Sequence, residues 1–109
     1  MAWLMLAVAI GTEVVATLAL RATAEGLRPL PVILLVVGYL TSFVLMALAL
    51  RTLNVGVVYA IWAGVGTAGT AVAGALLFGE RLNLTAVGGL VLIVAGVAVL
   101  ASSGSASHA

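Results

Sequence analysis

The chain has 109 residues, of which 65% are hydrophobic and only 6% are charged. Ordinary soluble domains carry about 25% charged residues, so this composition cannot cover a water-facing surface and predicts a membrane protein. The net charge of +1 argues against a basic nucleic-acid-binding surface, and the absence of cysteine excludes disulfide bonds.

Charged residues divide the chain into four apolar runs, and each run is long enough for a helix of about 20 residues to cross the bilayer. None of them alternates in the way that is typical of a barrel strand. We therefore expect an all-α membrane protein with transmembrane helices at about residues 2–20, 30–50, 56–78 and 84–102. They form one domain, residues 1–102, followed by a short polar tail, residues 103–109. No organelle-targeting signal is visible, so we expect a multi-pass protein of the inner (plasma) membrane.

The first predicted helix carries Glu13 midway along an otherwise apolar segment. At about 1.5 Å of rise per residue, the ~12 residues before it cover roughly half of a ~30 Å hydrocarbon core. An ionised carboxylate at that depth costs roughly 3 kcal/mol on insertion scales. A protonated carboxyl hydrogen-bonded to a neighbouring helix would be a purely structural explanation. Because intramembrane ionisable residues usually mark a proton or substrate pathway, we interpret Glu13 as a functional site.

The second predicted helix carries Tyr39 and Phe43, which are four positions apart and so share a face, with Ser42 beside them. Tyr39 lies near mid-membrane, away from the interface where tyrosines usually collect. Two interpretations stay open. Tyr39 is either a buried tyrosine hydrogen-bonded within the bundle or a residue that contacts substrate.

In the third predicted helix, Tyr59, Trp62 and Gly66 follow an i, i+3, i+7 spacing and share one face. Glycines, including Gly64 and Gly66, crowd the middle of this helix. They allow close packing of neighbouring helices, and they also weaken the helix locally. The first property predicts tight packing alone, and the second predicts a bend near Gly64–Gly66 that changes during transport. Clustered glycines without a proline discriminate weakly between these alternatives.

The fourth predicted helix has a stripe of small residues formed by Gly89 and Gly96, which are seven positions apart, with Leu92 and Ile93 nearby. A small-residue groove flanked by branched residues indicates helix–helix association in membranes. This helix has no polar group suited to chemistry, which fits a role in assembly. The one histidine, His108, falls in the tail, where we expect it to be solvated.

Five sequence segments spread from the first helix to the fourth carry a family resemblance. They are residues 13–17 (Glu-Val-Val-Ala-Thr), 25–26 (Glu-Gly), 59–66 (Tyr-Ala-Ile-Trp-Ala-Gly-Val-Gly), 79–82 (Gly-Glu-Arg-Leu) and 89–96 (Gly-Leu-Val-Leu-Ile-Val-Ala-Gly). In order, spacing and total length they resemble the small multidrug resistance transporters. An isolated intramembrane glutamate would be a weak signal, whereas all five segments in sequence make a specific one.

The resemblance implies four-helix subunits that assemble as an antiparallel homodimer, and exchange of protons for lipophilic cations such as quaternary ammonium compounds. By position, Glu13 would bind both proton and substrate. The resemblance implies a substrate chamber lined by Tyr39, Tyr59, Trp62, Ser42, Phe43, Ile10 and Thr17. It implies a bend in the third helix at Gly64 and Gly66, and a dimer contact on the fourth at Gly89, Leu92, Ile93 and Gly96.

Two alternatives to a multidrug exporter stay open. The first is a guanidinium exporter of the same family, a branch that typically places tryptophan three residues after the glutamate and commonly lacks the tyrosine of the second helix. Here those positions are Ala16 and Tyr39, and both favour the multidrug branch. The second is a small membrane subunit that does not transport. We do not expect an enzyme, a metal or a cofactor, because the sequence has no nucleophile–base pair, metal-ligand cluster or phosphate-binding loop.

Overall fold

The computed structural model describes residues 1–103 and confirms an all-α chain with four helices long and apolar enough to cross a membrane. The helices are α1 (Ala2–Ala22), α2 (Pro29–Ala49), α3 (Val55–Phe78) and α4 (Leu84–Ser102), with a short 3₁₀ turn, η1 (Thr23–Glu25), after α1. Apart from Ser103, the predicted tail and its His108 lie outside the described residues.

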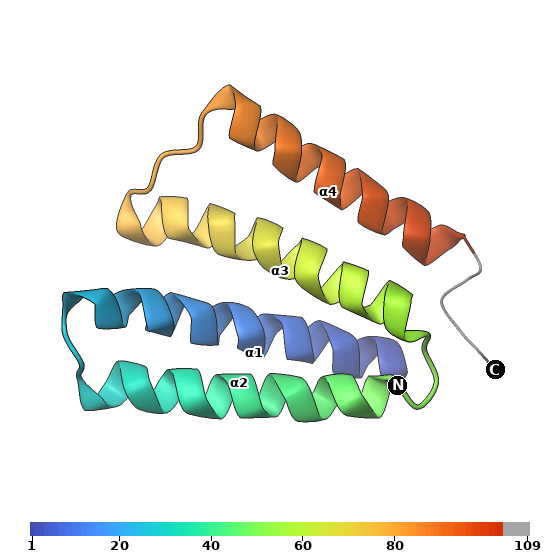
Figure 1. Cartoon of the computed structure of the whole chain (residues 1–109), viewed down its shortest axis with the longest axis horizontal. Coiled ribbons are helices and arrows are strands. Elements are labelled where there is room, and N and C mark those ends of the chain that lie inside the picture. Colours follow the sequence, from blue (N-terminus) through green and yellow to red (C-terminus); the bar gives the residue numbers. More distant parts are fainter. Residues whose placement is uncertain (104–109) are drawn as a thin grey trace.

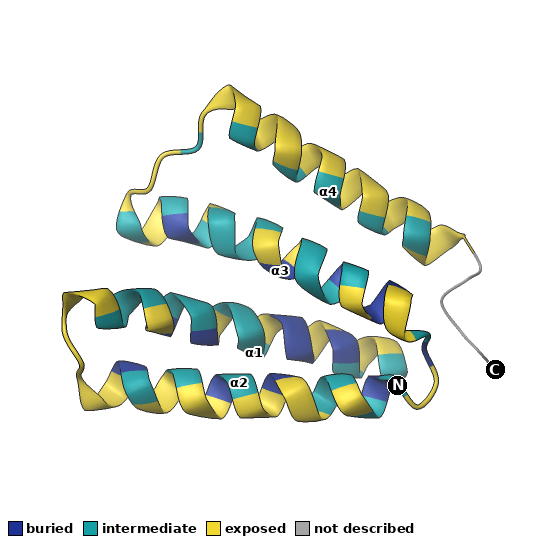
Figure 2. Ribbon diagram, viewed as in Figure 1, coloured by how far each residue is buried: buried dark blue, intermediate teal, exposed yellow. Residues whose placement is uncertain are grey.

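The four helices lie side by side in one layer, in the spatial order α2, α1, α3, α4 (Figure 1). Along its principal axes the chain measures 46 × 34 × 16 Å, so the layer is little thicker than one helix with its side chains. Such a layer leaves most apolar side chains exposed (Figure 2), and α4 has no buried residue. Lipid or another subunit must therefore cover much of this surface.

Local sequence explains where the helices begin and end. Pro29 stands in the first turn of α2, where a missing N–H costs little. Gly79 ends α3 with a left-handed backbone, φ 67°, a conformation that glycine adopts without a Cβ penalty. Asn83 caps α4, because its side-chain oxygen accepts a hydrogen bond from the backbone N–H of Ala86 at 2.8 Å.

Small residues bring α1 and α2 into close contact. Gly38 and Ala16 are both buried, and a Cβ added to Gly38 would lie 2.8 Å from the Cβ of Ala16 and 3.0 Å from the backbone oxygen of Thr12. Gly64 has the same role between α3 and α4, since a Cβ there would lie 2.7 Å from Cγ2 of Val97. The contacts between neighbouring helices thus depend on positions without a side chain.

The apolar core gathers at one end of the layer, where the N-terminal half of α1 meets the end of α2 and the start of α3. Its buried members are Leu6, Ile10, Ala49, Leu53, Val57, Val58 and Ile61. The candidate functional site lies outside this core, along the middle and the opposite end of α1 and α3.

Candidate functional site

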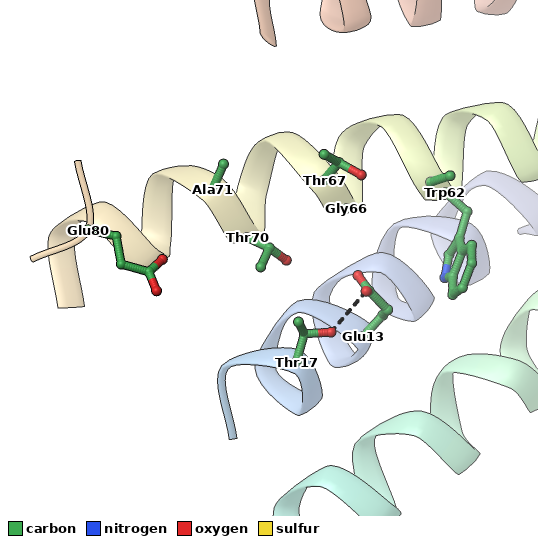
Figure 3. A pocket seen from close by; sticks show the side chains of 9 residues that line it. Glu13, Thr17, Trp62, Gly66, Thr67, Thr70, Ala71 and Glu80 are labelled. Atoms are coloured by element: carbon green, nitrogen blue, oxygen red, sulfur yellow. Dashed lines mark hydrogen bonds between the residues drawn. The ribbon is translucent and has the colours of Figure 1, made fainter. Parts of the chain in front are cut away.

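A cavity of about 440 Å³ lies between α1 and α3 (Figure 3). Its wall is formed by Glu13, Thr17, Trp62, Ala63, Gly66, Thr67, Thr70, Ala71 and Glu80. α1 supplies only Glu13 and Thr17, while α3 and the turn after it supply the rest. The cavity therefore extends from the intramembrane carboxyl of Glu13 to a second carboxyl, Glu80, near the end of α3.

The two oxygens of the Glu13 carboxyl have different surroundings. Oε1 accepts a hydrogen bond from the hydroxyl of Thr17 at 3.0 Å, one helical turn further along α1. The same Thr17 oxygen lies 2.8 Å from the hydroxyl of Tyr39 on α2. Oε2 is buried and has no hydrogen-bond partner among residues 1–103. Because a buried polar atom without a partner is costly, this oxygen is suited to accept a proton or to face a cation.

Gly66 makes the room that Glu13 occupies. A Cβ added at this position would lie 2.7 Å from Oε2 of Glu13, well inside van der Waals contact. The sequence left tight packing and a bend open for Gly64 and Gly66, and the bend that the family resemblance implies stays a prediction. α3 is continuous from Val55 to Phe78, and both glycines lie at close contacts, Gly66 with Glu13 and Gly64 with Val97.

Trp62 connects the cavity to α2. Its ring lines the cavity, and its Nε1–H donates a hydrogen bond to Oγ of Ser42 at 3.2 Å. Ser42 is fully buried and donates in turn to the backbone oxygen of Ala9 at 2.7 Å. This chain of hydrogen bonds fixes the indole relative to α1 and α2, one turn away from Gly66 and the Glu13 carboxyl.

The other predicted aromatic residues extend from Trp62 across one face of the layer. The ring centroids of Tyr59 and Trp62 are 5.9 Å apart, those of Phe43 and Trp62 are 6.0 Å apart, and those of Tyr39 and Phe43 are 6.3 Å apart. Tyr59 and Phe43 are 60% and 51% exposed. Neither is among the residues that line the cavity in this single chain. The four rings form a continuous aromatic surface beside Glu13.

Other predicted residues lie away from the cavity. Ile10 belongs to the apolar core. On α4, Leu92 is 74% exposed, and a Cβ added to Gly89 or Gly96 would meet nothing within 4 Å. Ile93 is placed differently, because its Cγ2 approaches the Cβ position of Gly64 on α3 to 3.1 Å. The predicted dimer-contact residues thus divide between an open face of α4 and the face that packs on α3.

Three polar residues that line the cavity were not predicted as site residues: Thr67, Thr70 and Glu80, the last of which contributed only to the family resemblance. Thr70 is notable because its hydroxyl oxygen is buried and, in the part of the chain that the structure describes, has no hydrogen-bond partner. A spacing signal was available, since Thr70 follows Trp62 and Gly66 at intervals of four and so continues their stripe on α3. Glu80 lies beyond the helix, where helical spacing gives no guidance.

The outer end of the cavity holds an ion pair. Nε of Arg21 lies 3.1 Å from Oε2 of Glu80, and the two side chains are 40% and 50% exposed. The guanidinium carbon of Arg21 also lies 4.9 Å from the centroid of the Phe78 ring. A smaller cavity of about 230 Å³ adjoins this pair and shares Thr17, Thr70 and Glu80 with the larger one.

The chemistry that this arrangement permits is reversible binding of cations. Within residues 1–103, no group of three or more histidine, cysteine or acidic side chains is placed to hold a metal ion. The cavity offers a carboxyl with one unpartnered oxygen, hydroxyl groups and an indole. A carboxylate and an aromatic face both attract a monovalent cation, and the carboxylate also takes up a proton.

The chain is similar over most of its length to known transporters. A family model described as Small Multidrug Resistance protein matches residues 1–93. A multidrug transporter of Pseudomonas aeruginosa is 47% identical over 98 residues, 90% of this chain and 89% of that protein. The quaternary ammonium compound-resistance protein QacF of Klebsiella aerogenes is 42% identical, with the same coverage of both chains. A guanidinium exporter of Citrobacter freundii is 38% identical over 89% of this chain and 92% of that protein.

Proposed function

This chain belongs to the small multidrug resistance family of multi-pass inner-membrane proteins, and from that premise we propose that it exports lipophilic monovalent cations in exchange for protons. Quaternary ammonium compounds are the substrate class that we favour. In this proposal, Glu13 binds either a proton or the cation, and the two compete for it. Competition couples their movements as long as the site opens to one side of the membrane at a time.

The observation that carries the proposal is the unpartnered oxygen of Glu13. Oε2 is buried against Gly66 at the wall of a cavity, while Oε1 is held by Thr17. A structural carboxyl would have both oxygens paired, because an unpaired buried polar atom costs about 1–3 kcal/mol. A site that binds a proton and a cation in turn needs a carboxyl oxygen that faces a cavity and has no other partner.

The aromatic surface supports the choice of substrate class. Trp62 lies at the cavity, and Tyr59 and Phe43 pack against its ring. A cation over an aromatic face gains roughly 0.5–2 kcal/mol per contact. Quaternary ammonium ions donate no strong hydrogen bonds, so a carboxylate with aromatic walls suits them. Such walls select for charge and apolar surface and are tolerant of shape, which favours a broad substrate range.

We further infer that two subunits form the working transporter, in the antiparallel arrangement that the family resemblance implies. In support, Tyr59 and Phe43, which extend the aromatic contacts of Trp62, are each more than half exposed in the single chain, so a second subunit can cover them. On α4, Gly89, Leu92 and Gly96 leave an apolar face that α3 does not cover. Small residues on such a face favour helix association in membranes.

The guanidinium alternative has support from one relative but conflicts with the packing of α1. A guanidinium exporter is among the similar proteins. That branch typically has tryptophan where this chain has Ala16. Ala16 is fully buried, and its Cβ already lies 2.8 Å from the Cβ position of Gly38. An indole could not enter this contact without separating α1 from α2, so the local packing favours the multidrug branch.

The proposal is tested by binding of tetraphenylphosphonium to the purified protein at a series of pH values from mildly acidic to alkaline. We expect binding to strengthen as the pH rises and protons leave the site, and to disappear in Glu13→Gln. Glu25→Gln is the matched control, because it removes the same charge from an exposed position after α1. It should bind like the wild type.

Transport completes the test. In proteoliposomes with a proton gradient, the wild type should drive uptake of the cation against its concentration gradient, and Glu13→Gln should not. Gradient-driven transport that survives in Glu13→Gln would refute the proposed mechanism. A protein that exchanges guanidinium for protons but does not bind tetraphenylphosphonium would establish the alternative substrate class instead.

A further inference from the structure

One face of α3 carries an ordered series of residues at intervals of four: Trp62, Gly66, Thr70, Gly74 and Phe78. In an α-helix, such residues form a continuous stripe that advances about 6 Å per interval. The stripe has an aromatic residue at each end, a glycine next to each aromatic residue, and a threonine in the middle. Each glycine faces a carboxyl group, and these two carboxyl groups occupy opposite ends of the cavity.

The outer half of the stripe repeats the contacts of the inner half. A Cβ at Gly66 would lie 2.7 Å from Oε2 of Glu13, and a Cβ at Gly74 would lie 2.5 Å from Oε1 of Glu80. Trp62 is the aromatic neighbour of the inner carboxyl, and Phe78 is the aromatic neighbour of the outer one. A carboxyl group beside an aromatic ring is thus present at both ends of the cavity.

The carboxyl of Glu80 and the ring of Phe78 already contact a cationic group, the guanidinium of Arg21. The guanidinium group of Arg21 donates from Nε to Oε2 of Glu80 at 3.1 Å, and its central carbon lies 4.9 Å from the centroid of the Phe78 ring. A carboxylate on one side and a ring face on the other are the two contacts expected for a bound organic cation. Arg21 therefore shows how such a cation fits between Glu80 and Phe78.

We propose that Glu80 and Phe78 form an outer binding site for organic cations, which the guanidinium group of Arg21 occupies in this structure. An incoming cation displaces Arg21 and then moves along the cavity to Glu13. This inference rests on the proposed function, because it assigns the first step of substrate entry to the same cavity.

The exposure of the ion pair makes displacement feasible. The side chains of Arg21 and Glu80 are 40% and 50% exposed. Solvent-exposed ion pairs contribute little to stability, because water screens the charges and holding two long side chains costs entropy. Arg21 is tethered to the end of α1, so it can move aside and return when the site empties. It competes with substrate for the outer site without blocking it permanently.

The middle of the stripe provides a polar connection between the two sites. Gly66 and Gly74 are eight residues apart, which corresponds to about 12 Å along α3. Thr70 lies halfway between them, lines both cavities, and has a buried hydroxyl oxygen without a hydrogen-bond partner. That oxygen is placed to accept a hydrogen bond from a hydrated cation as it passes.

The experiment measures how fast tetraphenylphosphonium reaches Glu13, by stopped-flow fluorescence of purified protein. A Trp3→Phe background leaves Trp62 as the only tryptophan, and it lines the cavity. Glu80→Gln should slow association about fivefold, which corresponds to roughly 1 kcal/mol. Arg21→Gln removes the competitor and should accelerate association by a similar factor. In the double variant, Arg21→Gln should have no further effect, because Arg21 acts only through the site that Glu80 forms.

Matched controls separate this mechanism from a general effect of charge. Arg81→Gln and Glu25→Gln remove the same charges from exposed positions in the segments that follow α3 and α1. Neither residue is among those that line the two cavities beside Thr70. Both should leave the association rate unchanged. If Arg21→Gln does not yield folded protein, Arg21→Lys replaces it. A compact ammonium lacks the planar fork of arginine, so we expect a smaller acceleration of about twofold, again only with Glu80 present.

Two results would overturn the outer site. The first is an Arg21 effect of the same size with and without Glu80, and the second is an equal effect of Arg81→Gln. Either result would mean that these substitutions change the association rate through long-range electrostatics and not through a binding site at Glu80. These failures differ from a failure of the proposed function, which would show as cation binding that persists in Glu13→Gln. Binding that needs Glu13, together with additive effects of Arg21 and Glu80, would refute the outer site alone.

Discussion

Replacement of Gly66 by alanine tests whether cation binding depends on the position of the Glu13 carboxyl. The new methyl carbon would lie 2.7 Å from Oε2, whereas ordinary van der Waals contact begins at 3.4 Å. The carboxyl must retreat by the difference, and this retreat strains the 3.0 Å hydrogen bond between Oε1 and Thr17. Inserting a methyl group into a packed site typically costs about 1–3 kcal/mol.

We expect this cost to apply when the cation is bound, because the carboxyl must then face the cation. Gly66→Ala should therefore weaken binding of tetraphenylphosphonium by about five- to 150-fold. Isothermal titration calorimetry at a fixed alkaline pH measures this change directly. Gly69→Ala is the matched control on the same helix, because its methyl carbon would lie 3.5 Å from Cγ2 of Val14, an ordinary contact. Both substitutions raise helix propensity by about 1 kcal/mol, so neither should prevent folding.

The reasoning fails if Gly66→Ala binds the cation as tightly as Gly69→Ala and the wild type. Such a result would mean that Glu13 moves freely or that the cation does not approach Oε2. Equal weakening in both variants would also contradict it, because the loss would then follow from changes in α3 as a whole. Thermal unfolding in detergent, measured by circular dichroism, verifies that each variant is folded before its binding is interpreted.

Three further predictions concern residues around this site. Thr17→Val removes the hydrogen bond to Glu13 and should weaken cation binding about fivefold. Tyr39→Phe should weaken it less, because Thr17 still donates to Glu13 in that variant. Equal affinities of the two variants in a binding titration would contradict this. Glu13→Asp should keep cation binding, because the carboxylate is retained; a binding titration in which this variant fails as completely as Glu13→Gln would contradict this. Gly64→Ala should destabilise the fold by about 1–3 kcal/mol through Val97, and Gly88→Ala, which meets nothing, should not; thermal unfolding of the two variants provides the comparison.

The sequence by itself was sufficient to predict the number and type of helices. All charged residues except Glu13 occur at or between the ends of long apolar runs. A bilayer requires each such run to satisfy its own backbone hydrogen bonds, which a helix does. Glu13 was recognisable for the same reason, because a carboxyl is costly within an apolar segment.

Only the tertiary structure determined what each of these groups contacts. The sequence left two possible roles open for Gly66, close helix packing or a bend in the helix. The structure places Gly66 against Oε2 of Glu13. Arg21 pairs with Glu80, which is 59 positions away in the chain, and spacing within one helix cannot predict such a contact. Thr70 drew no attention as one hydroxyl among many until its place between two carboxyls was known. Helical spacing fixes which residues share a face of one helix, but the rotation and offset of neighbouring helices depend on side-chain contacts between segments distant in sequence. The composition of the apolar runs therefore determined that this chain crosses the membrane, and the packing of α1 against α3 determined where its cavity and its charges meet.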